Sequence, residues 1–172
     1  MQTSVATPET SSTADARVGK YLTLRLAGEE FGIRVMQVRE IMGLQEITPV
    51  PQTPGHVKGV INLRGKVIPV ICLRSKFGLP AGEYTERTSI VVVQVHGGTM
   101  LAGIIVDGVS EVLNVAAADI EDAPDFGTGA DTSYLLGMAK IKGSIKILLD
   151  IEEVMKALGD VVTQLTAAVE GK

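Results

Sequence analysis

The chain has 172 residues, of which 45% are hydrophobic, 21% are charged and 3% are aromatic, and its formal net charge is −4. This hydrophobic content excludes a wholly disordered chain, and the acidic balance with so few aromatic residues argues against a nucleic-acid-binding protein. A single cysteine, Cys72, allows no intramolecular disulfide and fits a reducing compartment. No segment reaches the ~18 continuous apolar residues of a membrane span, and the N-terminus lacks a signal-peptide pattern, so we expect a cytoplasmic protein.

The first half of the chain predicts short strands joined by turns. Residues 1–17 are rich in Thr, Ser, Ala and Pro and predict a disordered tail. Alternating apolar and polar residues then indicate half-buried strands. These strands are expected at residues 21–26, at 31–35 and on both sides of a tight turn at Arg64–Gly65. Helical spacing of apolar residues predicts one short helical turn over 37–42 and a short helix over 73–79. The proline-rich segment 48–54 should cross the surface, because proline cannot donate a ladder hydrogen bond.

The second half repeats this alternation of strands and turns. Residues 89–95 are almost wholly apolar and predict a strand that is buried on both faces. Residues 102–106 should return beside it, and residues 145–149 should form the last strand. A polar loop is expected over 122–132. Apolar residues at positions i, i+3, i+4 and i+7 predict an amphipathic helix over 151–158.

The two halves carry the same pattern in the same order. Residues 32–42 return 71 positions later as residues 103–113, with five identical positions. Residues 59–71 are echoed 78 positions later by residues 137–149, where only two glycines are identical and Arg64 corresponds to Lys142. Such a repeat indicates two copies of one small β unit.

Each half has the length of a small closed barrel of the SH3 type, and closure removes the exposed edges of a sheet. A barrel of about 60 residues is marginally stable alone because it buries too small a share of its surface. We therefore expect a mainly β fold of two pseudo-repeated SH3-like five-stranded barrels, with short helices, a C-terminal helix and an apolar seam between the barrels.

Few groups in the chain could support catalysis or bind a metal. The only histidines, His56 and His96, are expected in turns, and a metal site or a nucleophilic site needs several such groups together. An acidic run over 119–125 lacks the EF-hand pattern and predicts a solvated loop. We therefore expect no enzyme, no cofactor and no metal site. An enzymatic alternative would require His96, Asp107 and Ser110 to converge.

Two charged residues, Glu40 and Arg64, lie within apolar stretches. They could be ordinary solvated charges, or they could form an ion pair that holds the segment 37–42 against the hairpin beside an apolar groove. An exposed pair contributes only ~0–1 kcal/mol, so its use would be to fix geometry. The matching positions in the second half, Glu111 and Lys142, keep the same charge signs, which favours the ion pair.

Several motifs have a specific spacing. They lie at residues 21–24 with 30–33, at 38–41, at 59–70, at 106–113 and at 134–137. The most specific are Asn62-Leu63-Arg64-Gly65 before a Val/Ile-Pro-Val strand and the element Val-Asp-Gly-Val-Ser at 106–110. Together, from about Lys20 to Leu158, they resemble the CheW family of chemotaxis coupling proteins.

The resemblance implies a non-catalytic adaptor that bridges membrane chemoreceptors to the histidine kinase CheA, whose regulatory domain shares the two-barrel fold. The cytoplasmic hairpin tip of the receptor would dock in the groove between the barrels. By position, the implied receptor-binding residues are Val35, Val38, Glu40, Ile41, Arg64, Gly103 and Val109. The regulatory domain of the kinase would pack against the exposed end of one barrel, and we place this contact on Leu44, Ile47, Lys66, Val67 and Ile68. The protein would be cytoplasmic and recruited to membrane receptor arrays.

The resemblance also suggests how the chain is divided. We expect a tail over 1–17, one CheW-like domain over 18–158 and a C-terminal tail over 159–172. Within the domain, the first barrel is expected at about 18–84, the second at about 85–150 and a helix at 151–158.

One residue departs from the family pattern. Members commonly carry Asp before Leu-Arg after the proline-containing strand, where this chain has Cys72, so a polar contact there is expected to be absent. Two other classes of function stay open at this point: a regulatory two-barrel domain of another two-component pathway, and an RNA-binding barrel, which conflicts with the acidic charge.

Overall fold

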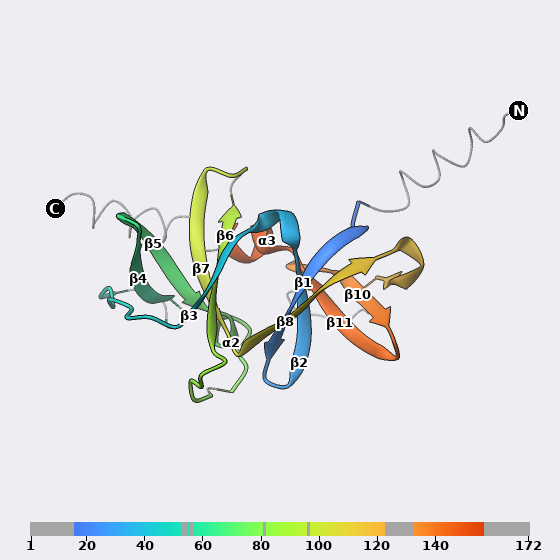
Figure 1. Ribbon diagram of the computed structural model, residues 1–172, viewed down its shortest axis with the longest axis horizontal. Helices are drawn as coiled ribbons and strands as arrows, with labels where there is room; N and C mark the ends of the chain where they lie inside the picture. The colour runs from blue at the N-terminus through green and yellow to red at the C-terminus, as the bar shows by residue number, and fades with distance from the viewer. Residues whose placement is uncertain are drawn as a thin grey trace, which may run out of the picture.

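The structure is a computed structural model that describes residues 16–52, 55, 57–80, 82–95, 97–122 and 133–156. Most of this part is strand (Figure 1). The strands are β1 (Gly19–Leu26), β2 (Glu29–Arg34), β3 (Val38–Gly43), β4 (Val57–Leu63), β5 (Lys66–Cys72), β6 (Ser89–Val95), β7 (Met100–Val106), β8 (Gly108–Val115), β9 (Ile120–Glu121), β10 (Leu135–Ile141) and β11 (Ser144–Leu149). The helical segments are the 3₁₀ turns η1 (Val35–Gln37) and η2 (Ala117–Asp119) and the α-helices α2 (Leu73–Lys76) and α3 (Ile151–Lys156).

The strands form two curved sheets that lie side by side in Figure 1. One has five strands in the order β3-β6-β7-β5-β4, and the other has the order β8-β1-β2-β11-β10-β9. The two orders match strand for strand, since β3 takes the place of β8, β6 of β1, β7 of β2, β5 of β11 and β4 of β10. The additional strand β9 has only two residues. The predicted class, a mainly β fold of two related five-stranded barrels with short helices, is confirmed.

The predicted division of the domain into barrels over 18–84 and 85–150 is wrong. The hairpin β1–β2 of the first half lies in the sheet of the second half, and the hairpin β6–β7 of the second half lies in the sheet of the first. Each exchanged hairpin is held by a parallel strand pair, β2 with β11 and β7 with β5. The pairing of strands that are distant in sequence depends on long-range contacts, which the local apolar pattern does not encode.

Three apolar cores explain the alternation along the strands. The largest core lies between the sheets and contains Leu22 and Leu24 from β1 together with Val91 and Val93 from β6. A second core lies inside the curved five-stranded sheet, and a third, around Tyr21, lies inside the other sheet. Residues 89–95 therefore face a core on both sides, as their apolar run predicts, because Ile90 and Val92 belong to the second core.

The two echoed segments keep their glycines for reasons of backbone conformation. Gly59 in β4 has a φ of +144°, and a Cβ atom there would lie 2.0 Å from the carbonyl oxygen of Thr48. The equivalent Gly137 in β10 has a φ of +153°, and its Cβ would lie 2.7 Å from the carbonyl oxygen of Glu121. At both positions a neighbouring backbone crosses the strand so closely that only glycine fits.

The tight turns of the two equivalent hairpins also have the same backbone conformation. The turn between β4 and β5 has φ values of 51° at Arg64 and 86° at Gly65, and the turn between β10 and β11 has 53° at Lys142 and 80° at Gly143. This confirms the predicted hairpin, in which both central residues adopt the left-handed conformation of a type I′ turn.

One predicted element is wrong, and one other is shorter than expected. Residues 37–42 do not form a helical turn, because β3 occupies Val38–Gly43 and pairs with β6. Half-buried and exposed residues alternate along β3, which is the period of a strand. The predicted helix 73–79 is limited to α2, whereas the predicted C-terminal helix is present as α3 as far as the structure describes it, to Lys156. The expectations for residues 1–15, 123–132 and 157–172 lie outside the described residues.

Candidate functional site

Four apolar residues on β3 and β8 extend the core between the sheets toward solvent. On β3, Val38 lies opposite Val93 and Ile41 lies opposite Val91 of β6. Directly paired residues of neighbouring strands point to the same face of a sheet. Because Val91 and Val93 belong to the core between the sheets, Val38 and Ile41 face the same way.

The second sheet presents the equivalent pair. On β8, Val109 lies opposite Leu24 and Val112 lies opposite Leu22, and both leucines of β1 belong to the same core. Val109 and Val112 are also the residues that follow Val38 and Ile41 by 71 positions in the repeat. The two copies of the β unit therefore present matching apolar residues along β3 and β8.

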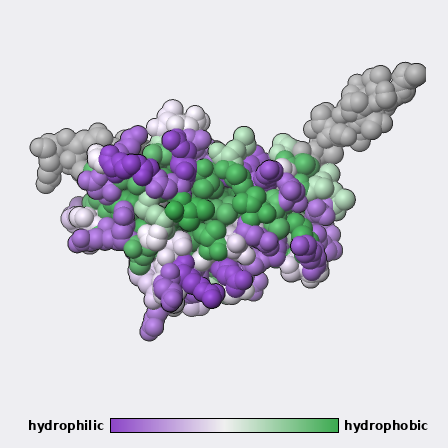
Figure 2. All heavy atoms as spheres, in the orientation of Figure 1, coloured by the Kyte–Doolittle hydropathy of each residue, from purple (hydrophilic) through white to green (hydrophobic). Residues whose placement is uncertain are grey.

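These residues are more exposed than an ordinary core residue. Ile41 is 46% exposed and Val112 is 53% exposed, and Met36 of the adjacent turn η1 is 75% exposed. Figure 2 shows apolar side chains gathered in the middle of the side of the molecule on which β3 and β8 lie in Figure 1. We call Val35, Met36, Val38, Ile41, Val109 and Val112 the apolar face. Exposed apolar area of this kind marks a site of protein association.

An ion pair borders the apolar face on the five-stranded sheet. Arg64 Nη1 donates to Glu40 Oε2 at 3.2 Å, and Arg64 Nη2 donates to Glu40 Oε1. This hydrogen bonding lowers the pKa of Glu40 and raises the pKa of Arg64. The pair joins the outer strand β3 to the turn between β4 and β5, at the two ends of the sheet order. The predicted pairing of Glu40 with Arg64 is confirmed.

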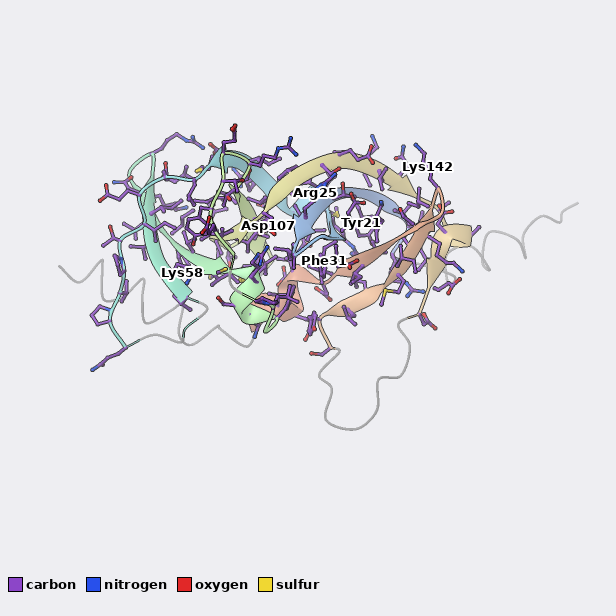
Figure 3. All side chains as sticks on the ribbon, turned by 90° about the horizontal axis from the view of Figure 1, so that it is seen from below. Tyr21, Arg25, Phe31, Lys58, Asp107 and Lys142 are labelled. Atoms are coloured by element: carbon purple, nitrogen blue, oxygen red, sulfur yellow. The ribbon has the colours of Figure 1, made fainter. Side chains whose placement is uncertain are left out.

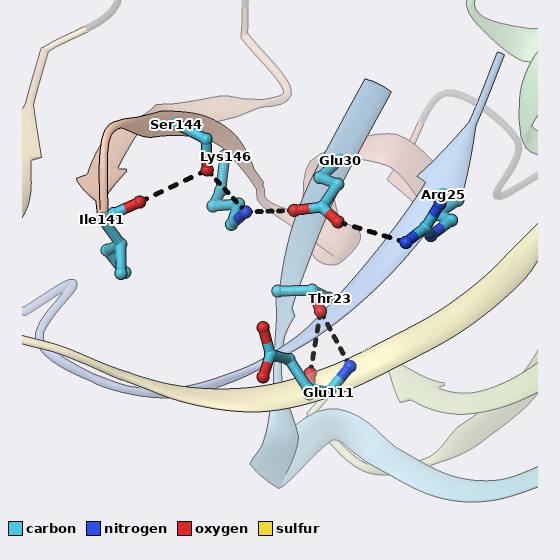
Figure 4. A network of polar contacts seen from close by, with 7 residues as sticks. All are labelled: Thr23, Arg25, Glu30, Glu111, Ile141, Ser144 and Lys146. Atoms are coloured by element: carbon cyan, nitrogen blue, oxygen red, sulfur yellow. Dashed lines mark hydrogen bonds and ion pairs between the residues drawn. The ribbon is translucent and has the colours of Figure 1, made fainter. Parts of the chain in front are cut away.

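The second half does not repeat this ion pair. Glu111 and Lys142 keep the charge signs, but among the described residues they form no ion pair with each other. The backbone of Glu111 is held instead by Thr23, whose Oγ1 donates to its carbonyl oxygen and accepts from its N–H, both at 2.9 Å (Figure 4). These bonds join β1 to β8 at the point where the register between the two strands shifts. The two copies of the repeat therefore present equivalent apolar residues on β3 and β8, but only the first copy forms the ion pair.

The remaining predicted receptor-binding residues do not share one hollow. Val35 lines a hollow of about 320 Å³ beside β1, and Val109 lines a separate hollow of about 500 Å³ beside Ser89 and Asp107. Gly103 is buried in the middle of β7, where a Cβ atom would lie 3.0 Å from Ile90 Cγ2. Gly103 therefore keeps β7 close to its neighbouring strands, and its part in receptor binding stays a prediction.

The residues predicted to bind the kinase lie around one end of the five-stranded sheet. Leu44 and Ile47 are half-buried against the core of that sheet, Lys66 is exposed and Val67 is half-buried. Ile68 is only 2% exposed and belongs to the same core, and its part in kinase binding stays a prediction. Side chains alternate along β5, so that Val67 and Ile68 point to opposite faces.

The sequence reasoning missed a polar junction around Asp107. Arg74 of α2 donates to the two carboxylate oxygens, from Nε at 2.8 Å and from Nη2 at 2.6 Å. The N–H of Ala27 donates to Oδ2 at 2.8 Å, and the N–H of Asp107 donates to the carbonyl oxygen of Arg25 at 2.9 Å. Hydrogen bonding by Arg74 is the main cause that lowers the pKa of Asp107. The motif Val-Asp-Gly-Val-Ser could have drawn attention to Asp107, but nothing in the sequence names Arg74 as its partner.

This junction also bears on the enzymatic alternative. The Asp107 carboxylate accepts three hydrogen bonds, from Arg74 and Ala27, so it is already engaged and is poorly placed to orient a histidine. His96 itself lies outside the described residues, as does His56. Within the described ranges, no three residues among His, Cys, Asp and Glu gather closely enough to hold a metal ion.

Cys72 stands at the start of α2 and makes no capping hydrogen bond there. The repeat places Asp150 at the equivalent position before α3, where its Oδ1 accepts from the N–H of Glu152 at 3.0 Å and of Glu153 at 3.3 Å. These are the bonds by which an aspartate caps a helix. The contact that Cys72 lacks is therefore a helix cap.

None of the helices in the described part of the chain is long and apolar enough to cross a membrane. The site is thus a surface of apolar residues from two related sheets, bordered by one ion pair.

Comparison with known proteins places this architecture in a family. The family model for the CheW-like domain matches residues 20–159. The chain is similar to a chemotaxis protein CheW of Klebsiella aerogenes, with 39% identity over 86% of this chain and 88% of the relative, and to one of Rhizobium meliloti, with 37% identity over 77% and 84%. It is also similar to the crystal structure of the scaffolding protein TtCheW from Thermoanaerobacter tengcongensis, with a TM-score of 0.73 and 34% identity over 81% of this chain and 93% of that one. The chain therefore belongs to the CheW family, and it is a non-catalytic scaffold and adaptor of chemotaxis signalling.

Proposed function

We propose that the apolar face docks the cytoplasmic hairpin tip of a membrane chemoreceptor, while the free end of the five-stranded sheet holds the regulatory domain of the histidine kinase CheA. The adaptor would join the two without chemistry of its own. Its recruitment from the cytoplasm to membrane receptor arrays would then follow from receptor binding.

The observation that carries the proposal is the apolar face itself. Ile41 on β3 and Val112 on β8 are exposed, and each lies opposite a residue of the core between the sheets. Met36 in the turn η1 before β3 has most of its side chain in solvent. An amphipathic helical hairpin buries its apolar positions in a surface of this kind. Burial of ~600–800 Å² on each partner would give a reversible interface of the signalling type.

The end of the five-stranded sheet supports the second contact. Lys66 and Val67 begin β5 next to the turn at Arg64, and they stand at the edge of the core that Leu44 and Ile47 cover. This end is separate from the apolar face, since the side chains of Leu44 and Ile47 pack into the five-stranded sheet and not between the sheets. Two partners could therefore bind at the same time.

Substitution of Ile41 and Val112, which occupy equivalent positions in the two copies of the repeat, tests the receptor site. We expect Ile41→Asp and Val112→Asp each to weaken binding of a receptor hairpin fragment, because a carboxylate would be desolvated at the centre of the contact. We expect Kd to rise about tenfold or more, and a tenfold rise corresponds to a loss of about 1.4 kcal/mol of binding free energy. Isothermal titration of the full chain with the receptor fragment measures the affinity, and co-purification with the CheA regulatory domain measures the ternary complex.

Ile145→Asp is the matched control. Ile145 is 57% exposed and equally apolar, but it lies in β11 close to the hairpin turn at Lys142. Figure 3 shows Lys142 at the end of the molecule away from the five-stranded sheet. Its replacement should leave receptor affinity unchanged. If Ile41→Asp and Val112→Asp bind the receptor fragment as tightly as the control does, the apolar face is not the receptor site.

A further inference from the structure

The chain passes between the two sheets at two places in its described strands. After β2 it crosses to β3 through the three residues of η1, and after β7 it crosses to β8 through Asp107 alone. The apolar face is built around these crossings, because Val35 and Met36 lie in η1 and Val109 follows Asp107 by two residues. The placement of β8 relative to β3 therefore depends on how Asp107 is held.

Asp107 is held from both sheets at once. Arg74 lies in α2, which follows β5 of the five-stranded sheet, and it donates two hydrogen bonds to the carboxylate. Ala27, in the turn between β1 and β2 of the other sheet, donates a third, and Arg25 of β1 accepts from the Asp107 backbone. Figure 3 shows Asp107 near the middle of the molecule, close to Arg25.

Arg74 is itself fixed in one arrangement. Its Nη1 donates to the carbonyl oxygen of Pro80 at 2.5 Å, so that Nε, Nη1 and Nη2 all have partners. Gly82 covers the guanidinium so closely that a Cβ atom there would lie 2.7 Å from Arg74 Cζ. The Arg74 and Asp107 side chains are only 21% and 33% exposed. A two-pronged arginine–carboxylate pair with this degree of cover fixes orientation as well as distance.

We propose that Arg74 and Asp107 are positioning residues for partner binding, which hold the two sheets at the spacing that brings β3 and β8 into one apolar face. Neither residue belongs to that face, and they act on the partner through Val109 and the start of β8. This inference deepens the proposed function and rests on it, since the face that the pair positions is the proposed receptor site.

The experiment measures sheet spacing and affinity on the same full-length variants. Spin labels on cysteines placed at the exposed Lys66 and Lys142, one in each sheet, report the distance between the sheets by pulsed electron paramagnetic resonance, in a background in which Cys72 is replaced by serine. Arg74→Gln, Asp107→Asn and the double variant are compared with the parent. Lys140→Gln is the matched control, because it breaks an ion pair with Glu121 that lies wholly within the six-stranded sheet.

Arg74→Gln and Asp107→Asn should each broaden the distance distribution and weaken binding of the receptor fragment about tenfold. An effect of this size is typical of residues that interact within one hydrogen-bond network. The double variant should be no weaker than either single variant. Lys140→Gln should change neither quantity. If a variant does not fold, Arg74→Lys takes its place, since it keeps the charge but cannot form the two-pronged contact.

An unchanged distance distribution in the folded variants would overturn the proposal, whatever happens to affinity. Weaker binding without broadening would instead assign the pair to the contact surface. If the parent protein fails to bind the receptor fragment, the proposed function fails, and the distance distributions alone still decide whether Arg74 and Asp107 hold the sheets.

Discussion

Glu40 lies on β3 and Arg64 lies in the turn between β4 and β5, and their ion pair joins the two ends of the strand order of the five-stranded sheet. The Arg64 side chain is 71% exposed, so the pair is screened by solvent and contributes little to folding. Its main effect is to hold β3, which carries Val38 and Ile41, against the turn between β4 and β5. The second copy lacks this ion pair at Glu111 and Lys142, where Thr23 holds the backbone of Glu111 instead.

Breaking this pair should affect binding more than stability. We expect Arg64→Ala to leave the free energy of unfolding nearly unchanged, because the pair is exposed, while receptor-fragment affinity falls about fivefold or more. The charge exchange Glu40→Arg with Arg64→Glu should restore most of the affinity by re-forming the pair. Urea denaturation and isothermal titration measure the two quantities, and a loss of affinity that the exchange leaves unrepaired would show that Arg64 itself touches the partner.

Asp107 predicts a particular dependence of stability on pH. Because Arg74 and the Ala27 N–H lower its pKa in the folded protein, the ionised carboxylate contributes stability that is fully present above its unfolded pKa of about 3.9. That contribution is lost as the pH falls through the lower folded pKa. Asp107→Asn should therefore be less stable than the parent at pH 7, and the difference should shrink below about pH 4. Urea titrations across this range test it, and a difference that stays constant with pH would contradict it.

At the level of elements, backbone geometry determines which residues the repeat keeps. Gly59 and Gly137 share a conformation that other residues avoid, and each lies under a neighbouring backbone. The rest of these two strands is free to vary, provided that the apolar alternation is kept. This is why glycines are the only identical residues in that echo.

Replacing Gly59 should be costly, whereas replacing a glycine without these constraints should not. Gly59→Ala places a Cβ atom 2.0 Å from the Thr48 carbonyl oxygen at a φ of +144°, so the chain before β4 must move. We expect a loss of about 2–4 kcal/mol in the free energy of unfolding. Gly43→Ala in β3 is the control, since nothing lies within 4 Å of its Cβ position. Thermal and urea denaturation compare the two, and equal stabilities would contradict the close approach.

The whole molecule is a single folding unit because its largest core belongs to both sheets. A stack of aromatic rings also joins them, with Phe77, which follows α2, lying 4.8 Å from Tyr134 and 6.0 Å from Phe31 between ring centroids. Phe31 lies in β2 and Tyr134 precedes β10, both of the six-stranded sheet. The exchanged hairpins and this stack leave neither half of the chain with a complete sheet.

Fragments of the chain should therefore fold only together. Residues 18–84 contain the hairpin β1–β2 without β8 and β11, the strands that flank it, and they lack β6 and β7 of the five-stranded sheet. We expect this fragment and residues 85–158 each to be unfolded alone and to regain native strand content when mixed, because each supplies the hairpin that the other needs. Circular dichroism of the separate and mixed fragments tests this, with the full chain as reference. A cooperative thermal transition of residues 18–84 alone would contradict the exchange.

The amino-acid sequence by itself determined the β class, the doubled unit, the strand buried on both faces and the turn at Arg64–Gly65, and it offered the ion pair of Glu40 with Arg64 as one of two alternatives. These features depend on local periodicity, on backbone conformation or on the comparison of the two copies, all of which can be read along the chain. The resemblance to the CheW family suggested the binding residues, two of which, Gly103 and Ile68, are buried in the structure.

Only the tertiary structure decided which strands exchange between the sheets, that residues 38–43 form a strand, that Val112 joins Ile41 in one apolar face, and that Arg74 holds Asp107. Each of these depends on contacts between distant segments. Periodicity shows that a residue is buried, but it does not show against which strand, because many pairings satisfy the same alternation. The packing of the whole core selects one of these pairings, because all strands must pair and bury their apolar residues in the same structure.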